Sequence, residues 1–307
     1  MAVTRSELTV SSGVLDATFL PDLGMLGVSL RHRGAELLAL PGGLDGYRAG
    51  RVTGLPLLAP WANRLGSGRY EVDGVAVDLG DFGDAGHLRA LGLHTDEHGL
   101  PIHGTMTAQP GWQVARIDRR SLVTRFDFGT RPDLLASFPF PHLLRMAVTV
   151  EASTLTVTTT LAPTTDRPVP VAFGYHPYLR LPGVRREDVG LRLPPRRHLE
   201  LDGRSIPTGA GHDEPAEDEP LGDRTFDEHY QLGDDRRLAV RGGGRRVTVT
   251  VGDGYRWAQV FAPPAADFVC LEPLTAPINA LVDGGYTLVR PGGSYTAEFT
   301  VRVEDEA

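Results

Sequence analysis

Alternation of apolar and polar residues is the feature of this sequence that most constrains its fold. A period of two is typical of strands that bury one face. The alternation recurs in residues 122–128, 146–150, 155–159, 247–251 and 295–303. A short polar break joins the second segment to the third and predicts a hairpin, and Gly242-Gly243-Gly244 predicts a turn before the fourth.

Helical spacing is scarce, because 37 Gly and 24 Pro interrupt almost every window of the sequence. Many short strands with Gly/Pro turns indicate a sandwich rather than a βαβ fold, so we expect an all-β protein. No fixed-period repeat and no Pro-rich linker divides the chain, and we expect one domain over residues 1–307. Residues 208–223 are acidic and poor in apolar side chains, and are expected to form a solvated surface loop.

The composition excludes several classes of function. Acidic residues outnumber basic ones by 39 to 31, which disfavours nucleic acid or an anionic membrane as a partner. Every basic residue is arginine, so chemistry that depends on a lysine Schiff base or a P-loop lysine is excluded. Cys270 is the only cysteine, so no intrachain disulfide can form, and its apolar surroundings predict a structural role. Without a leader or a long apolar stretch, the chain is expected to be soluble and cytoplasmic.

Five segments interrupt the alternation with polar residues that core packing would not select. In the first, an apolar run leads into Asn63 and Arg64, which is also the pattern of a strand end with a surface arginine. In the fourth, Asp227 precedes the aromatic Tyr230, and the alternative is an ordinary loop carboxylate.

The second segment, residues 94–103, reads HTDEHGLPIH and concentrates histidines with acidic residues. Such a cluster suggests a metal site, but Gly99 and Pro101 deny the second histidine pair a helical scaffold, and no fourth ligand is evident. We therefore expect no metal there. His103 is either a surface histidine or a residue that contacts a sugar.

The third and fifth segments supply candidates for acid–base chemistry. His176 lies between Tyr175 and Tyr178, whose flat faces suit the C–H face of a pyranose; from spacing alone, a satisfied core histidine is an equal alternative. Glu272 follows four apolar residues and precedes Pro273. Because buried strands do not readily accept a carboxylate, we expect Glu272 to end its strand and face a cleft, where partial burial raises its pKa.

Taken together and in this order, the five segments resemble the aldose 1-epimerase (galactose mutarotase) family over residues 5–303. The joint pattern is an Asn-Arg pair, a His-Gly followed by Trp112, a His-x-Tyr, an Asp-x-x-aromatic, and a Leu-Glu-Pro with Pro277 and Asn279 downstream. The resemblance implies a large antiparallel β sandwich, the galactose mutarotase-like supersandwich, with a sugar bound in an open cleft.

The resemblance also implies roles for these residues. His176 would be the general acid that protonates the ring oxygen, and Glu272 the general base that removes the proton of the anomeric hydroxyl. The positions that match sugar-binding positions of the family are Arg64, His103 and Asp227, with Asn63 beside Arg64. Interconversion of the α and β anomers of a free hexose then needs one acid and one base with pKa values near neutrality, and no metal or cofactor. The expected partner is a small sugar, and the expected state is a monomer or a homodimer.

Three other functions stay open at this point. A non-catalytic carbohydrate-binding sandwich would not need both His176 and Glu272. A hexose-6-phosphate epimerase would need several arginines at the cleft. A lyase or hydrolase would use Glu272 with another carboxylate, and for the two carboxylates of a hydrolase Asp227 is the only obvious partner. The segment after His103 lacks a glycine common in the best-studied branch of the family, and Tyr175 stands in place of an Asn-containing lead-in, which bears on sugar specificity.

Overall fold

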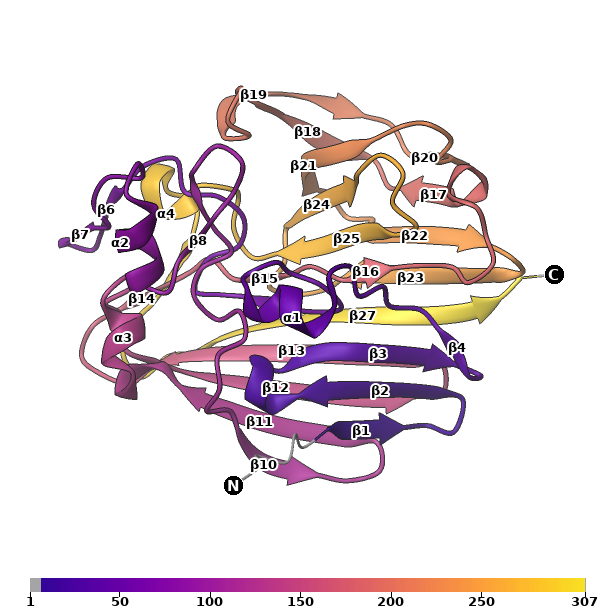
Figure 1. Cartoon of the computed structure of the whole chain (residues 1–307), viewed down its shortest axis with the longest axis horizontal. Coiled ribbons are helices and arrows are strands. Elements are labelled where there is room, and N and C mark those ends of the chain that lie inside the picture. Colours follow the sequence, from indigo (N-terminus) through magenta and orange to yellow (C-terminus); the bar gives the residue numbers. More distant parts are fainter. Residues whose placement is uncertain (1–6, 307) are drawn as a thin grey trace.

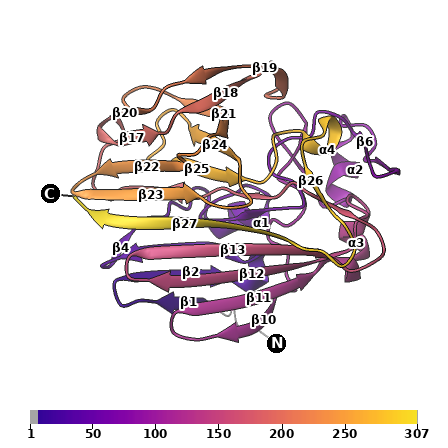
Figure 2. The ribbon, with the colours of Figure 1, turned by 180° about the vertical axis from the view of Figure 1, so that it is seen from behind.

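The computed structural model describes residues 7–306, in which strands form most of the regular structure. The largest sheet has nine antiparallel strands. It lies in front in Figure 2 and behind the other layer in Figure 1. In spatial order its strands are β10 (Gln113–Ile117), β11 (Ser121–Asp127), β12 (His142–Glu151), β13 (Thr154–Pro163), β27 (Tyr295–Asp305), β23 (Arg245–Val251), β22 (Arg237–Gly242), β17 (Gly190–Leu193) and β20 (Glu217–Pro220).

Two further sheets form the opposite layer (Figure 1). The smaller contains β1 (Leu8–Ser11), β2 (Leu15–Leu20), β3 (Leu26–His32) and β4 (Ala35–Glu36). The larger runs in the order β19 (Pro207–Glu214), β18 (Arg196–Leu201), β21 (Phe226–Leu232), β24 (Trp257–Ala262), β25 (Val269–Leu274), β15 (Gly174–Tyr175) and β5 (Leu57–Leu58), and β16 (Tyr178–Leu179) also pairs with β25. These antiparallel layers confirm the predicted all-β sandwich.

The remaining elements are short. Three two-stranded pairs are β6 (Arg69–Val72) with β7 (Val75–Asp78), β8 (His94–Thr95) with β9 (Pro101–Ile102), and β14 (Val169–Val171) with β26 (Thr287–Val289). The helices are α1 (Gly43–Arg48), α2 (Ala85–Ala90), α3 (Pro132–Leu135), α4 (Ala280–Asp283) and the 3-10 turns η1 (Pro21–Leu23), η2 (Phe128–Thr130) and η3 (Arg186–Asp188). Within residues 7–306, no helix has the length and apolar character needed to cross a membrane.

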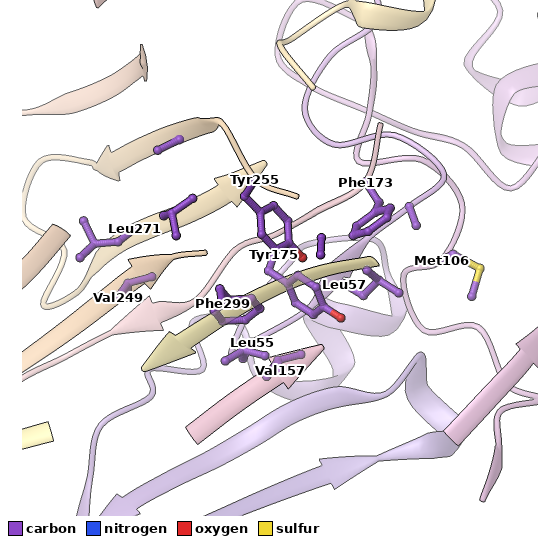
Figure 3. Close-up of a cluster of buried hydrophobic side chains, with 14 of the residues drawn as sticks. Leu55, Leu57, Met106, Val157, Phe173, Tyr175, Val249, Tyr255, Leu271 and Phe299 are labelled. Atoms are coloured by element: carbon purple, nitrogen blue, oxygen red, sulfur yellow. The ribbon is translucent and has the colours of Figure 1, made fainter. Parts of the chain in front are cut away.

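The core lies between the layers, and Figure 3 shows its aromatic centre. Tyr175 packs on Phe299 with ring centroids 4.9 Å apart, and its hydroxyl hydrogen-bonds to the Thr159 hydroxyl at 2.6 Å. Burial of each such side chain stabilises the fold by roughly 1.5–3 kcal/mol. One cluster of buried hydrophobic residues contains both Val10 and Val303, which supports one domain; that assignment stays a prediction.

The predicted strands and turns are present with two differences. The hairpin joins β12 to β13 with Val148 opposite Val157, and the glycine turn joins β22 to β23. Phe128, however, begins the turn η2 after β11 ends at Asp127, whose side chain accepts a hydrogen bond from the Gly129 N–H at 3.0 Å. By accepting this hydrogen bond, the Asp127 side chain stabilises a turn at Phe128 in place of further strand pairing.

The loop predicted for residues 208–223 is the second difference, because β19 and β20 occupy most of it. Both are edge strands with mostly exposed side chains, and Arg241 holds Asp218 across the edge at 2.9 Å. An edge strand that is solvated on both faces has no need of alternating apolar residues, so its composition resembles that of a loop.

His142 gives the core a stability that depends on pH. Its fully buried ring stacks on Phe128 at 4.5 Å, and its Nδ1 donates to the Phe140 carbonyl at 2.7 Å. Burial lowers the pKa of His142 to about 4 from 6.5. As the pH falls, His142 becomes protonated in the unfolded chain before it does so in the folded protein. The free energy of unfolding therefore decreases between pH 6.5 and pH 4, by up to about 3 kcal/mol.

We therefore expect urea unfolding of His142→Gln to depend less on pH than that of the wild type. The difference in slope between pH 6 and pH 4.5 should approach about 1.4 kcal/mol per pH unit, and the two slopes should coincide above pH 7. Equal slopes over the acidic range would show that the His142 pKa is not lowered in the fold.

Candidate active site

Glu272 lies inside β25, a strand in which all six residues are buried. The expectation that Glu272 ends its strand is wrong, since pairing with β24 continues through Pro273 to Leu274. In an antiparallel strand the N–H and the carbonyl oxygen of one residue point to the same side. The Pro273 carbonyl oxygen lies on the side of Gly174, so the N–H that proline lacks would also have pointed to that side and is not needed for pairing with β24. On that side the partner is interrupted between β15 and β16, at His176 and Pro177.

That interruption places His176 directly against Glu272, with Nε2 and Oε1 3.1 Å apart. The imidazole stacks on Tyr178 at a ring distance of 4.6 Å and meets the edge of Phe261 at 5.9 Å. Tyr175 instead points into the core beside Phe299, so the expectation that both neighbouring tyrosines offer faces to a sugar is wrong for Tyr175. Side chains an odd number of positions apart in an extended chain point to opposite sides. Tyr175 and Tyr178 are three positions apart, so their rings lie on opposite sides of this segment.

Burial shifts the pKa values of both members of this pair. Burial raises the pKa of Glu272 well above 4.5, reinforced by the nearby charge of Asp227 and opposed by Arg64. Burial lowers the pKa of His176 to about 3. We expected pKa values near neutrality for both groups, and these shifts correct that expectation. Each shift favours the uncharged form of the side chain, because burial away from water destabilises the charged form.

When both groups of the Glu272–His176 pair are uncharged, the pair holds one titratable proton, on the Glu272 carboxyl. Transfer of this proton to the imidazole gives an ionised carboxylate and a protonated His176 with the same number of protons. Oε2 of Glu272 and Nδ1 of His176 are buried and have no hydrogen-bond partner among residues 7–306. The adjacent Oε1 and Nε2 atoms of this pair can deliver one proton and accept another.

Arg64 is the second centre of the site and is held by carboxylates. Its Nε lies 2.6 Å from Asp96 Oδ2, and its Nη2 lies 3.4 Å from Glu97 Oε1 and 3.6 Å from Asp227 Oδ2. Asp96 also accepts hydrogen bonds from the backbone N–H groups of His98 at 2.9 Å and Leu100 at 2.8 Å. Asp96, considered from the sequence only as part of a metal cluster, fixes both its loop and the guanidinium.

Asn63 and His103 connect Arg64 to the Glu272–His176 pair. The Asn63 carboxamide oxygen accepts from the Arg64 backbone N–H at 2.9 Å, and the Asn63 carbonyl accepts from the His103 N–H at 2.9 Å. Both residues have left-handed backbones, with φ of 59° and 64°. The His103 ring lies 5.7 Å from that of His176, and burial lowers the pKa of His103 well below 6.5.

Asp227 on β21 is oriented by a chain of buried hydrogen bonds. Gln259 on β24 donates from Nε2 to Asp227 Oδ1 at 2.7 Å, and its Oε1 lies 3.2 Å from Nδ1 of His229. Because Nε2 of His229 accepts from the Ile278 N–H at 3.3 Å, its proton lies on Nδ1, facing Gln259. Sequence reasoning missed Gln259 and His229; the available signal was a polar side chain inside an apolar strand.

All six residues singled out from the sequence line one cavity of about 580 Å³. They are Asn63, Arg64, His103, His176, Asp227 and Glu272. Its volume lies in the range of small-ligand sites. Cys270 lies behind it, fully buried, and burial raises the pKa of its thiol well above 9, which supports the structural role expected for it.

Fold and cavity together define a β-sandwich protein in which a buried glutamate and a buried histidine lie side by side in one cavity. The family model described as aldose 1-epimerase matches residues 24–302, and the chain belongs to the aldose 1-epimerase family. No curated protein sequence matches the chain. The family match confirms the resemblance stated from the five segments, and membership implies an isomerase of the epimerase type.

Solved structures support the same fold. A galactose mutarotase-like protein from Clostridium acetobutylicum superposes with a TM-score of 0.81 at 18% identity, covering 98% of this chain and 96% of the other. An aldose epimerase homologue from C. elegans gives 0.80 at 16% identity, covering 99% and 100%. A galactose 1-epimerase from Lactobacillus acidophilus gives 0.76 at 14% identity, covering 98% and 95%. The galactose mutarotase-like sandwich is thereby confirmed.

Loss of Arg64 is expected to cost both stability and binding. In Arg64→Ala the Asp96 carboxylate, whose side chain is 2% exposed, loses its cationic partner, and the free energy of unfolding should fall by about 3–5 kcal/mol. The exposed pair of Arg69 and Asp78 provides a control, since Arg69→Ala should cost at most about 1 kcal/mol. Urea unfolding measures both, and comparable losses would contradict the structural importance of the Arg64 cluster.

Proposed function

We propose that the chain is a mutarotase that interconverts the α and β anomers of a free hexose, with Glu272 as general base and His176 as general acid. The observation that carries this proposal is the 3.1 Å separation of Glu272 Oε1 and His176 Nε2 inside the cavity. The two oxygens of a hemiacetal are bonded to the same carbon. A base for one oxygen and an acid for the other must therefore be adjacent, as these two groups are.

The reaction follows from this pair. With the single proton of the pair on His176, the ionised Glu272 removes the proton of the anomeric hydroxyl while His176 protonates the ring oxygen, and the bond between the anomeric carbon and the ring oxygen breaks. The open aldehyde rotates about its bond to the next carbon, and the ring closes on the other face with the two proton transfers reversed. Each transfer contributes about 10²–10⁴-fold when the group is well placed, and the overall exchange of one proton for another leaves no residual charge.

Arg64, His103 and Asp227 are proposed to hold the sugar hydroxyls, with Asn63 positioning Arg64. Arg64 and His103 offer donors at the cavity wall, and Asp227 offers an acceptor oriented by Gln259. Such contacts hold the reacting carbon against the acid–base pair, which lowers the barrier by orientation. Tyr178 and Phe261 line the same cavity and supply apolar faces for the C–H side of the ring.

The charge of the cavity favours a neutral sugar over a sugar phosphate. Its lining contains four carboxylates and two arginines, Arg51 and Arg64. Arg64 is engaged by Asp96, Glu97 and Asp227, so its charge is compensated before a ligand arrives. The hexose-6-phosphate alternative would then depend on Arg51. Because one solved relative is named a galactose 1-epimerase, galactose and glucose are the sugars to test first.

A hydrolase is disfavoured by how Asp227 is held. One of its oxygens accepts from Gln259, and the other lies 3.6 Å from Arg64, which suits hydroxyl binding more than proton donation to a leaving group. A purely binding role is disfavoured by the buried Glu272–His176 pair, since burying two ionisable groups is costly without a use for them. A cytoplasmic location and a monomeric or homodimeric state stay predictions.

Polarimetry on freshly dissolved α-glucose, α-galactose and α-glucose 6-phosphate tests the proposal. We expect the protein to accelerate mutarotation of a neutral hexose well above the buffer rate, before and after exhaustive chelation. Sugar binding without acceleration would favour the carbohydrate-binding alternative, and a strong preference for the phosphate would favour the phosphohexose alternative. A large loss on chelation that a divalent cation restores would overturn the metal-free mechanism.

A further inference from the structure

A second cluster of titratable side chains lies outside the catalytic cavity, on β18 and β19. His198 and His212 are directly opposite each other in the antiparallel register, and Glu214 follows two residues later on the same face as His212. Glu214 Oε1 lies 2.8 Å from His198 Nδ1 and 3.4 Å from His212 Nε2. One ligand atom from each of the three residues falls within 4.8 Å of the others.

The neighbours of this cluster fix its orientation. Glu228 on β21 lies 2.7 Å from Nε2 of His198, the ring nitrogen that faces away from Glu214. Buried Arg196 lies 2.6 Å from Oε2 of Glu214 and stacks over the Tyr230 ring at 4.8 Å. A carboxylate behind a ligating histidine is the usual second contact in metal sites, because it fixes the tautomer and strengthens the ligand.

Both ring nitrogens of His198 contact carboxylate oxygens, Nδ1 that of Glu214 at 2.8 Å and Nε2 that of Glu228 at 2.7 Å. The contact at Nε2 holds the ring so that Nδ1 faces Glu214, on the strand that also carries His212.

We propose that His198 Nδ1, His212 Nε2 and Glu214 Oε1 form a binding site for a divalent transition-metal ion of the zinc class, with the fourth position open to water. Two imidazoles and one carboxylate are a ligand set that zinc accepts in tetrahedral geometry. Because the Glu228 carboxylate accepts a hydrogen bond at Nε2 of His198 and so holds the ring in place, the three ligand atoms need little rearrangement to surround an ion.

The proposed metal site is separate from the catalytic cavity. His198, Glu214 and Glu228 line a cavity of about 460 Å³ that shares no lining residue with the catalytic one. Asp227 and Glu228 are consecutive on β21 and point to opposite faces of the sheet. The same strand therefore contributes Asp227 to the catalytic cavity and Glu228 to the proposed metal site. The proposed ion stabilises the edge formed by β18, β19 and β21 rather than taking part in proton transfer.

Titration calorimetry of zinc chloride into the metal-stripped, tag-free protein at pH 7.5 tests this inference. We expect one zinc per chain in the wild type. His212→Ala, a change at a side chain that is 57% exposed, should weaken binding at least tenfold, and Glu228→Gln should weaken it about 10–100-fold by removing the carboxylate behind His198. His98→Ala, in the other histidine-rich segment, is the matched control and should bind zinc as the wild type does.

Three outcomes would overturn the proposal: no stoichiometric zinc binding, unchanged affinity in both His212→Ala and Glu228→Gln, or loss of binding in His98→Ala. Circular dichroism verifies that each variant is folded. Because the readout is metal binding and not mutarotation, failure of the catalytic proposal leaves this test unaffected.

Discussion

Glu272→Gln is expected to lower kcat by about 10²–10⁴-fold while sugar binding changes little. Glutamine keeps the size of the side chain and fills the same place in β25, but it cannot accept the proton of the anomeric hydroxyl. The hydroxyl-binding groups around Arg64 lie on other elements and are not displaced. Removal of an interaction made only during proton transfer reduces kcat and kcat/KM together and spares KM.

Polarimetry with varied sugar concentration separates the two constants for this variant. Glu71→Gln, an exposed residue of the β6 strand, is the matched control and should retain the wild-type rate. Near-normal kcat for Glu272→Gln in a correctly folded protein would require the proposed mechanism to be abandoned. A raised KM with unchanged kcat would instead place Glu272 among the groups that hold the sugar.

His176→Asn is expected to lower kcat by a similar factor, about 10²–10⁴-fold, because the ring oxygen loses its proton donor. The acid and the base act in the same bond-breaking step, so the double variant with Glu272→Gln should be little slower than either single variant. The 3.1 Å contact between the two groups is the structural reason for this non-additivity.

The double variant provides the sharper measurement. Multiplied losses would show that the two residues act in different steps, and a normal kcat for His176→Asn would remove His176 from the role of acid. His87→Asn, on the exposed surface of α2, is the control and should keep full activity. Circular dichroism should be unchanged in every variant used for this comparison.

The sequence by itself determined the strands and the identity of the chemistry-bearing side chains. Alternation along residues 146–159 predicted the β12–β13 hairpin, because a period of two follows from the pleat of the backbone and requires no distant partner. Glu272 and His176 were noticeable because each interrupts a segment that is otherwise apolar or aromatic. Edge strands β19 and β20 were missed for the converse reason, since solvated strands have no apolar period to detect.

Tertiary structure alone decided how those side chains act. The pKa of His176 falls to about 3 and that of Glu272 rises because both are buried together, and burial depends on residues distant in the chain. Asp96 as the partner of Arg64, and Gln259 behind Asp227, likewise depend on contacts between separate elements. The convergence of His198 with Glu214 follows from the register between two strands. A local pattern specifies which face of a strand is buried, whereas the charge state and partners of a residue are set by what packs against that face.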